Sequence, residues 1–213
     1  MKITTNSNNR QKTGSVLSTR SLAIMAMLAG MSVILMLFEI PLWFAPPFYE
    51  LDFSEVPVLI GAFALGPVAG VIIELLKILL NLVITGTQTA GVGELGNFLI
   101  GCSLVLPATI IYYRKKTFKT AVIGLMVGSI CMVILGNFMN AFILLPAYAY
   151  FFNMPIEALI AMGTRVNPAI DNLSTFIFLA VTPFNLLKGV AVSLITLLLY
   201  KRVSSGIKSI MEL

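Results

Sequence analysis

Apolar residues form long, nearly uninterrupted runs along this chain, and polar residues gather in the segments between them. The runs occupy residues 21–38, 56–66, 67–84, 95–113, 120–146 and 183–200, with a moderately apolar piece at 156–182. An α-helix needs about 20 apolar residues to cross the hydrocarbon core of a bilayer. The pattern therefore predicts an all-α bundle of six transmembrane helices, in which the second is short for a full span.

Glycine and proline predict where these helices begin and end. Gly66 and Pro67 separate the second and third runs with a sharp turn. Pro183 suits the first turn of the last helix, because the N–H that proline lacks has no helical partner there. Residues 147–182 are then a long outer connection between helices five and six, in which "IEALIAMG" and "DNLSTFIFLAV" are expected to form short helices at the membrane surface.

The composition agrees with an integral membrane protein. The chain is 58% hydrophobic and 11% charged, whereas soluble domains carry about 25% charged residues. We expect one membrane domain at 21–202, with cytoplasmic tails at 1–20 and 203–213. Histidine is absent, which removes the commonest general base and metal ligand, and no phosphate-binding loop motif is present.

Charge is distributed asymmetrically between the apolar runs. Eleven of the 14 basic residues precede the first run, separate the fourth from the fifth or follow the last: Lys2, Arg10, Lys12, Arg20, Arg114, Lys115, Lys116, Lys119, Lys201, Arg202 and Lys208. The acidic residues of the opposite side are Glu39, Glu50, Asp52, Glu55, Glu94, Glu157 and Asp171. The positive-inside rule makes the basic side cytoplasmic, so that both termini are inside.

Two lysines lie within apolar runs, where a charge at mid-membrane costs about 2.5–3.5 kcal/mol. Lys77 follows Glu74 by three residues and precedes Asn81 by four, which places all three on one helix face. An internal ion pair with an interhelical hydrogen bond is the simpler interpretation. Contact with a solute is the alternative.

The second lysine lies at the same predicted depth as two asparagines. Asn140 is close to the outer end of helix five, and Asn185 and Lys188 are in the first turns of helix six. Each asparagine alone is as well explained by helix–helix hydrogen bonding, and Lys188 by snorkelling to the headgroups. Three polar groups at one level nevertheless favour an outward-facing cavity.

Two further stretches carry candidate functional residues. The first outer loop, "EIPLWFAPPFYELDFSEVP", is rich in aromatic residues that form either an interfacial belt or the wall of a ligand cavity. On helix one, Ala23, Ala26 and Gly30 form a stripe of small residues that permits close approach of another helix.

Four segments occur in a distinctive order: "LDFSEVPVLIGAFALGPVAG", "GNFLIG", "NAFILLPAY" and "PFNLLKG". Together, over residues 20–202, they resemble the riboflavin-specific substrate-binding (S) component of energy-coupling factor (ECF) transporters. The resemblance implies a protein without a cofactor that binds riboflavin in the bacterial plasma membrane. It also implies three partner subunits, a transmembrane coupling subunit and two cytosolic ATPases.

The resemblance also assigns residues. An asparagine before "LLPxY", together with the asparagine and lysine of "PFNxxKG", contacts the flavin in that family, and these match Asn140, Asn185 and Lys188. The further candidate substrate-binding residues are Asn81, Asn97, Phe53 and Tyr148. Ala23, Ala26 and Gly30 match the coupling-subunit surface loosely, because glycine stands where the family has alanine. The outer carboxylates lead us to expect that riboflavin is preferred to its phosphate.

Three alternatives remain open at this stage. The same fold could bind another vitamin. An intramembrane enzyme could use Glu74, Lys77 and Glu94, although no nucleophile–base set is visible. A stand-alone transporter could use Glu74 and Lys77 as a proton relay, although the chain lacks two comparable broken-helix halves.

Overall fold

The computed structural model describes residues 18–212, and the side chains of residues 18–200. The main helices are α1 (Thr19–Met36), α2 (Glu55–Leu65), α3 (Pro67–Thr85), α4 (Val92–Lys115), α5 (Phe118–Met139) and α9 (Thr182–Glu212). The shorter elements are π-helix η1 (Asn140–Leu144), α6 (Leu145–Phe151), α7 (Ile156–Val166), α8 (Leu173–Phe176), π-helix η2 (Ile177–Val181) and the antiparallel strands β1 (Ile40–Pro41) and β2 (Glu50–Leu51). Of the predicted tail charges, Lys2, Arg10 and Lys12 and the side chains of Lys201, Arg202 and Lys208 lie outside the described residues.

Five helical segments of the described chain are long and apolar enough to cross a membrane: Thr19–Met36, Pro67–Thr85, Val92–Lys115, Phe118–Phe151 and Leu173–Tyr200. The protein is therefore a multi-pass membrane protein. The second of the six predicted spans, α2, has 11 residues, about 16 Å of helix at 1.5 Å per residue. Every residue of α2 from Glu55 to Phe63 is buried, so α2 is an internal helix packed among α1, α3 and α9.

The predicted connection at 147–182 is wrong in its bounds. Helix five continues through η1 and α6 to Phe151, and the last helical segment begins at Leu173 rather than at Pro183. The stretch "IEALIAMG" does form a short helix, α7, whereas "DNLSTFIFLAV" begins the last long helix. At the other end of that helix, α9 includes residues 203–212 of the predicted tail.

Proline did not end these helices because the chain changes pitch just before it. The π-helix η1 precedes Pro146 and the π-helix η2 precedes Pro183. A proline inside an α-helix removes one backbone hydrogen bond and crowds the preceding turn. An extra residue in the turn before it is a local adjustment that lets the helix continue, and such π-turns are frequent at functional sites.

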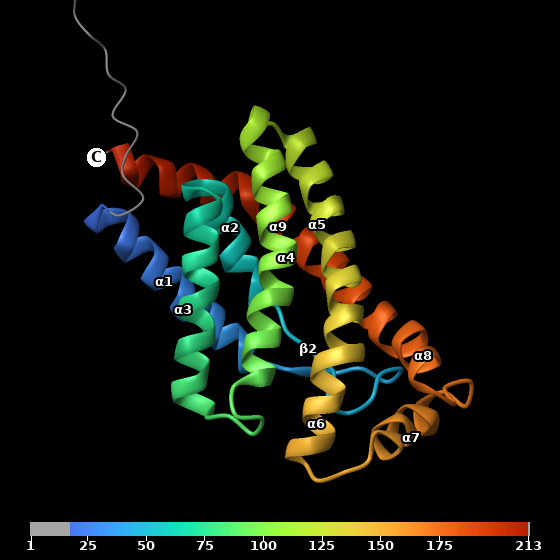
Figure 1. Ribbon diagram of the computed structural model, residues 1–213. Coiled ribbons are helices and arrows are strands. Elements are labelled where there is room, and N and C mark those ends of the chain that lie inside the picture. Colours follow the sequence, from blue (N-terminus) through green and yellow to red (C-terminus); the bar gives the residue numbers. More distant parts are fainter. Residues whose placement is uncertain (1–17, 213) are drawn as a thin grey trace, which may run out of the picture.

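The helices run side by side, and the connections fall into two groups at opposite ends of the bundle (Figure 1). The α2–α3 turn, the α4–α5 connection and the C-terminal end of α9 lie at one end, at the top of the view. The segment 37–54, with β1 and β2, runs through the other part of the bundle, near α6, α7 and α8. The basic connection with Arg114, Lys115 and Lys116 is therefore remote from the acidic first loop.

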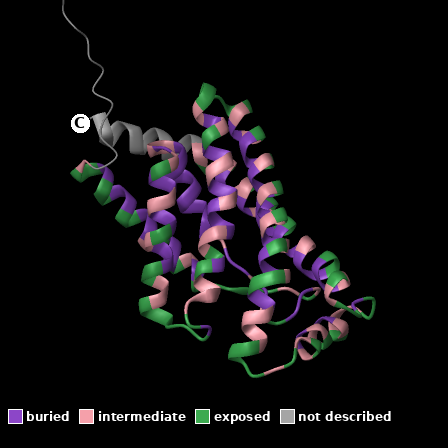
Figure 2. Cartoon of the chain, in the orientation of Figure 1, coloured by how far each residue is buried: buried purple, intermediate pink, exposed green. Residues whose placement is uncertain are grey.

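Along the helices, buried residues gather on the sides that face the bundle interior, and exposed residues lie on the outer sides (Figure 2). Large apolar residues such as Val83 and Leu198 are exposed on the outer surface of the bundle, where lipid replaces water as the solvent. Among the described residues, the buried side chains that carry a formal charge are few: Asp52, Glu55, Glu74, Lys77 and Lys188. Because buried charges must be paired, these five residues indicate where the fold contains specific ionic contacts as well as apolar packing.

Candidate functional site

A cavity of about 150 Å³ lies where the first loop meets the bundle. It is lined by Met36, Glu39, Phe48, Tyr49, Glu50, Asp52, Gly93, Asn97, Ile100, Met132, Asn140, Leu144, Tyr148, Phe184, Asn185 and Lys188. An adjoining cavity of about 410 Å³ shares Met36, Glu39, Phe48, Gly93 and Tyr148 with it and adds Asn81, Thr89 and Glu94. The two cavities share part of their lining, and together they combine aromatic walls with many polar groups. Such a lining suits a small molecule that has both an aromatic and a polar part.

Lys188 points inward and is held by Asp52. Its Nζ donates to Asp52 Oδ2 at 2.6 Å, and Lys188 is only 8% exposed. The backbone N–H of Ser54 donates to Asp52 Oδ1 at 2.8 Å. Burial alone would raise the pKa of Asp52, but the charges of Lys188 and Lys77, with the hydrogen bonds from Lys188 and Ser54, hold it well below its usual value. Lys188 therefore does not snorkel, and it faces an ionised partner.

Asn140 is fixed at both ends of its amide. The hydroxyl of Tyr49 donates to its Oδ1 at 2.5 Å, and its Nδ2 donates to the carbonyl oxygen of Gly136 at 2.8 Å. Burial, with the neighbouring Tyr148, raises the pKa of Tyr49 well above its usual value. Tyr49 thus remains a neutral donor, and the first loop is fastened to the π-turn that begins at Asn140.

Asn185, on α9, lines the same cavity as Asn140. Its Nδ2 donates to the carbonyl oxygen of Val181 at 3.1 Å. Gly136 leaves the space for this amide, because a Cβ at position 136 would lie 2.7 Å from Asn185 Nδ2. Beside them, Asn137 Nδ2 donates to Thr182 Oγ1 at 2.9 Å and joins α5 to α9. Both asparagines lie next to a change of helical pitch, since Asn140 begins η1 and Asn185 follows shortly after η2.

Aromatic rings of the first loop form part of the cavity wall. The ring centroids of Tyr49 and Phe184 are 5.2 Å apart, and those of Phe48 and Tyr148 are 6.3 Å apart. Trp43 of the same loop is 89% exposed. Phe48 and Tyr49 line the cavity, as the wall interpretation of the loop expects, whereas the exposed Trp43 is not among the lining residues.

The carboxylates of Glu39 and Glu50 lie at the rim of the cavity and belong to its lining. Partial burial, a hydrogen bond with Glu50 and the negative charges of Glu50 and Asp52 raise the pKa of Glu39 to about 7, although the positive charge of Lys188 opposes the shift. Glu39 therefore exchanges a proton near neutral pH. The charge at the rim of the cavity therefore depends on pH near pH 7.

The structure brings together most of the predicted site residues. Asn140, Asn185, Lys188, Asn97 and Tyr148 all line the smaller cavity, and Asn81 lines the adjoining one. Phe53 packs against the apolar core and is not among the lining residues.

The sequence did not single out Asp52 or Phe184, whereas Tyr49 belongs to the aromatic residues of the first loop that could form the wall of a cavity. Asp52 was counted only among the acidic residues of the outer side. The signal that could have found it is the lysine itself, since a buried ammonium requires a carboxylate nearby. The acidic residues of the first loop, which is predicted at the same end of the bundle as Lys188, are the candidates for this carboxylate.

Glu74 and Lys77 form the internal ion pair of the simpler interpretation, with Nζ 2.8 Å from Glu74 Oε1. Glu55 is a third member of this cluster, 2.7 Å from the same Nζ, and none of the three lines a cavity described above.

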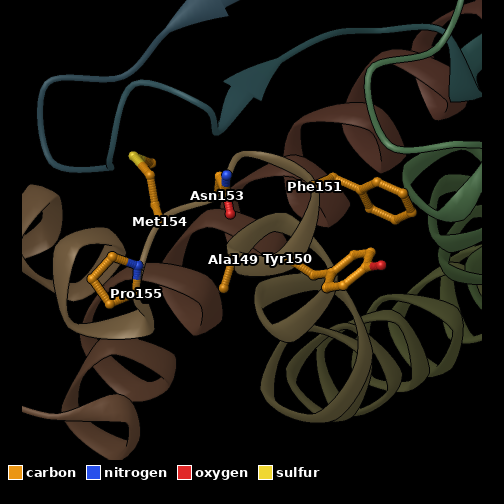
Figure 3. Close-up of a pocket in the computed structure, with 6 residues that line it drawn as sticks. All are labelled: Ala149, Tyr150, Phe151, Asn153, Met154 and Pro155. Atoms are coloured by element: carbon orange, nitrogen blue, oxygen red, sulfur yellow. The ribbon is translucent and has the colours of Figure 1, made fainter.

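A second hollow lies at the α6–α7 connection and is larger, at about 670 Å³ (Figure 3). Its lining residues are Ala149, Tyr150, Phe151, Asn153, Met154 and Pro155. All six come from one short stretch of chain, and none is charged. It therefore lacks the converging polar groups that recognise a polar ligand, and the smaller cavity is the better candidate site.

Comparison with known proteins places this arrangement in a family. Residues 20–200 match the family model for the "ECF transporter, substrate-specific component". The chain belongs to this family. The resemblance found in the sequence motifs is thereby confirmed, and the alternative of an intramembrane enzyme is set aside because the family consists of transporter components.

Similar proteins cover nearly the full chain. The riboflavin transporter RibU of Staphylococcus aureus is 37% identical over 95% of this chain and 100% of its own length. The riboflavin transporter FmnP of Bacillus subtilis is 28% identical over 90% of this chain and 96% of its own. A solved structure described as the S component of a bacterial ECF transporter is 34% identical, with a TM-score of 0.68 over 88% of this chain and 96% of that one.

Proposed function

We propose that this protein is the riboflavin-binding S component of an ECF uptake transporter, with the flavin bound in the cavity between the first loop, α5–η1–α6 and α9. The observation that carries the proposal is the convergence of Lys188, Asn140 and Asn185 on one aromatic-lined cavity. The relatives named above as riboflavin transporters support the choice of ligand.

The chemistry of the cavity matches the two halves of the vitamin. The pyrimidine edge of the isoalloxazine ring has two carbonyls and an N–H, which asparagine amides and a lysine ammonium can satisfy. The apolar side of the ring needs aromatic or aliphatic walls, and Phe48 and Phe184 supply them. A drug-sized ligand occupies about 300 Å³ or more, so the flavin extends from the smaller cavity into the adjoining one.

We further propose six membrane-inserted helices with both termini cytoplasmic, and assembly with a transmembrane coupling subunit and two ATPases in the bacterial plasma membrane. The basic α4–α5 connection supports that orientation. The stripe on α1 supports the docking surface, because Ala23 and Ala26 are exposed and a Cβ at Gly30 would meet no atom within 4 Å. Small residues on an uncovered face permit close helix packing.

The test of the ligand is quenching of riboflavin fluorescence by the detergent-purified protein. We expect tight quenching by the native protein and much weaker quenching by the Asn185→Ala and Lys188→Met variants. Asn153→Ala, in the hollow of Figure 3, is the matched control and should bind normally. Unquenched riboflavin with folded native protein would indicate another vitamin on the same fold.

A further inference from the structure

The interior of the bundle contains a closed ionic cluster made by α2 and α3. Lys77 Nζ lies 2.7 Å from Glu55 Oε1 and 2.8 Å from Glu74 Oε1, and it is 3.4 Å from Ser54 Oγ. Lys77, Glu55 and Glu74 are 1%, 3% and 0% exposed. Solvent therefore cannot screen the charges of this cluster.

The charges of the cluster do not balance. It holds two carboxylates and one ammonium. Among the described residues, the nearest further charge in contact with the network is Asp52, which is already paired with Lys188 at 2.6 Å. With both glutamates ionised, one negative charge would be left uncompensated in a dry interior. A buried group in that position takes up a proton rather than bear the cost of desolvation.

The geometry leaves a place for that proton. Within the described part of the chain, Glu55 Oε2 and Glu74 Oε2 are buried and have no hydrogen-bond partner, while the same Lys77 Nζ holds both carboxyl groups close together, at 2.7 Å and 2.8 Å. The backbone of α4 closes the other side, since a Cβ on Gly101 would lie 2.3 Å from Glu74 Oε1 and 3.0 Å from Glu55 Oε1. Cys102 is the neighbouring titratable group on α4.

We propose that Glu55 and Glu74 share one proton, so that the cluster with Lys77 is a neutral, buried proton-binding site. The proton resides mainly on Glu74, because Glu55 is the first residue of α2, where the helix dipole stabilises a negative charge. Glu74 is in the middle of α3 and has no such support. The site is joined to the cavity through Ser54, whose N–H bonds to Asp52, the partner of Lys188.

Infrared difference spectroscopy of the purified protein in H₂O and D₂O tests this site directly, through the C=O stretch of a protonated carboxylic acid. All variants carry Glu39→Gln, because Glu39 is itself partly protonated near neutral pH. We expect the acid band in this background at pH values where ordinary glutamates are ionised. Both Glu74→Gln and Glu55→Gln should abolish it, because each leaves one carboxylate to pair with one ammonium. Glu157→Gln, on exposed α7, should retain it.

The measurement on the background protein decides the proposal even if a cluster variant does not fold. Absence of any acid band in that protein would overturn it. So would a band that survives in both folded Gln variants, since the proton would then be elsewhere. A band that appears only when sodium is removed would indicate a cation site instead and would equally contradict the proposal. The result does not depend on which vitamin the cavity binds.

Discussion

The two buried lysines of this protein have similar surroundings in sequence and different ones in space. Each lies in an apolar helix, and each is ion-paired at 2.8 Å or less. Lys188 has one carboxylate partner and a side open to a cavity. Lys77 has two carboxylate partners and lines neither cavity of the candidate site.

This difference assigns Lys188 to ligand recognition and Lys77 to the stability of the fold. A lysine with one partner and a free side can donate further hydrogen bonds to a ligand. A lysine held between two carboxyl groups has its charge matched inside the cluster, and packing fixes its surroundings. Removing Lys188 should therefore reduce binding more than stability, and removing Lys77 should do the reverse.

The largest expected effect is on stability, from Lys77→Met. This variant removes the ammonium that pairs with Glu55 and Glu74 in the interior, which should lower the free energy of unfolding by about 3–5 kcal/mol. Thermal unfolding in detergent measures the loss. The triple variant Lys77→Met, Glu55→Gln, Glu74→Gln removes every charge of the cluster and should recover most of it. If the triple variant recovers none of the lost stability, the packing of these side chains, and not their charge, stabilises the fold.

The next effect is on riboflavin affinity, from Lys188→Met. Loss of a buried charged partner should cost about 2–4 kcal/mol of binding free energy, or about 30- to 1,000-fold in Kd. Fluorescence titration measures it, and exposed Lys115→Met at the opposite end is the control. Adding Asp52→Asn to Lys188→Met should restore stability but not affinity. An unchanged Kd in folded Lys188→Met would remove Lys188 from the site.

A smaller effect is expected from Gly136→Ala. The new Cβ would lie 2.7 Å from Asn185 Nδ2, so the amide must move while its chemistry is preserved. Affinity should fall by about 10-fold, the equivalent of one misplaced hydrogen bond. Gly30→Ala adds the same methyl where nothing lies within 4 Å and should leave affinity unaltered. Equal effects from both variants would argue against a precise position for Asn185.

The smallest effect concerns the rim. As pH rises through the value of about 7 for Glu39, this carboxyl loses its proton and the rim gains negative charge. Affinity for the phosphate of riboflavin, relative to riboflavin itself, should then fall by about two- to five-fold, the size of a surface charge interaction. Glu39→Gln should remove the part of the pH dependence that is not due to the phosphate. An identical profile in the variant would exclude Glu39 as its source.

The sequence predicted the residues of the cavity better than the path of the helices that carry them. Asn140, Asn185 and Lys188 were grouped by depth, and they do line one cavity. The bounds of the last helix were wrong because proline was read as a start signal, and a π-turn that lets a helix continue through proline has no clear sequence signature. Asp52 and Glu55 were missed as partners because pairing across 136 and 22 residues is a property of the tertiary fold.

The structure of the protein with riboflavin bound tests the central claim most directly. We expect the pyrimidine edge of the flavin within hydrogen-bonding distance of Asn140 or Asn185 and of Lys188, with the ring between the aromatic walls and the Lys77 cluster unchanged. A flavin bound elsewhere, for example in the hollow of Figure 3, would contradict the assignment of Lys188 to recognition and Lys77 to structure.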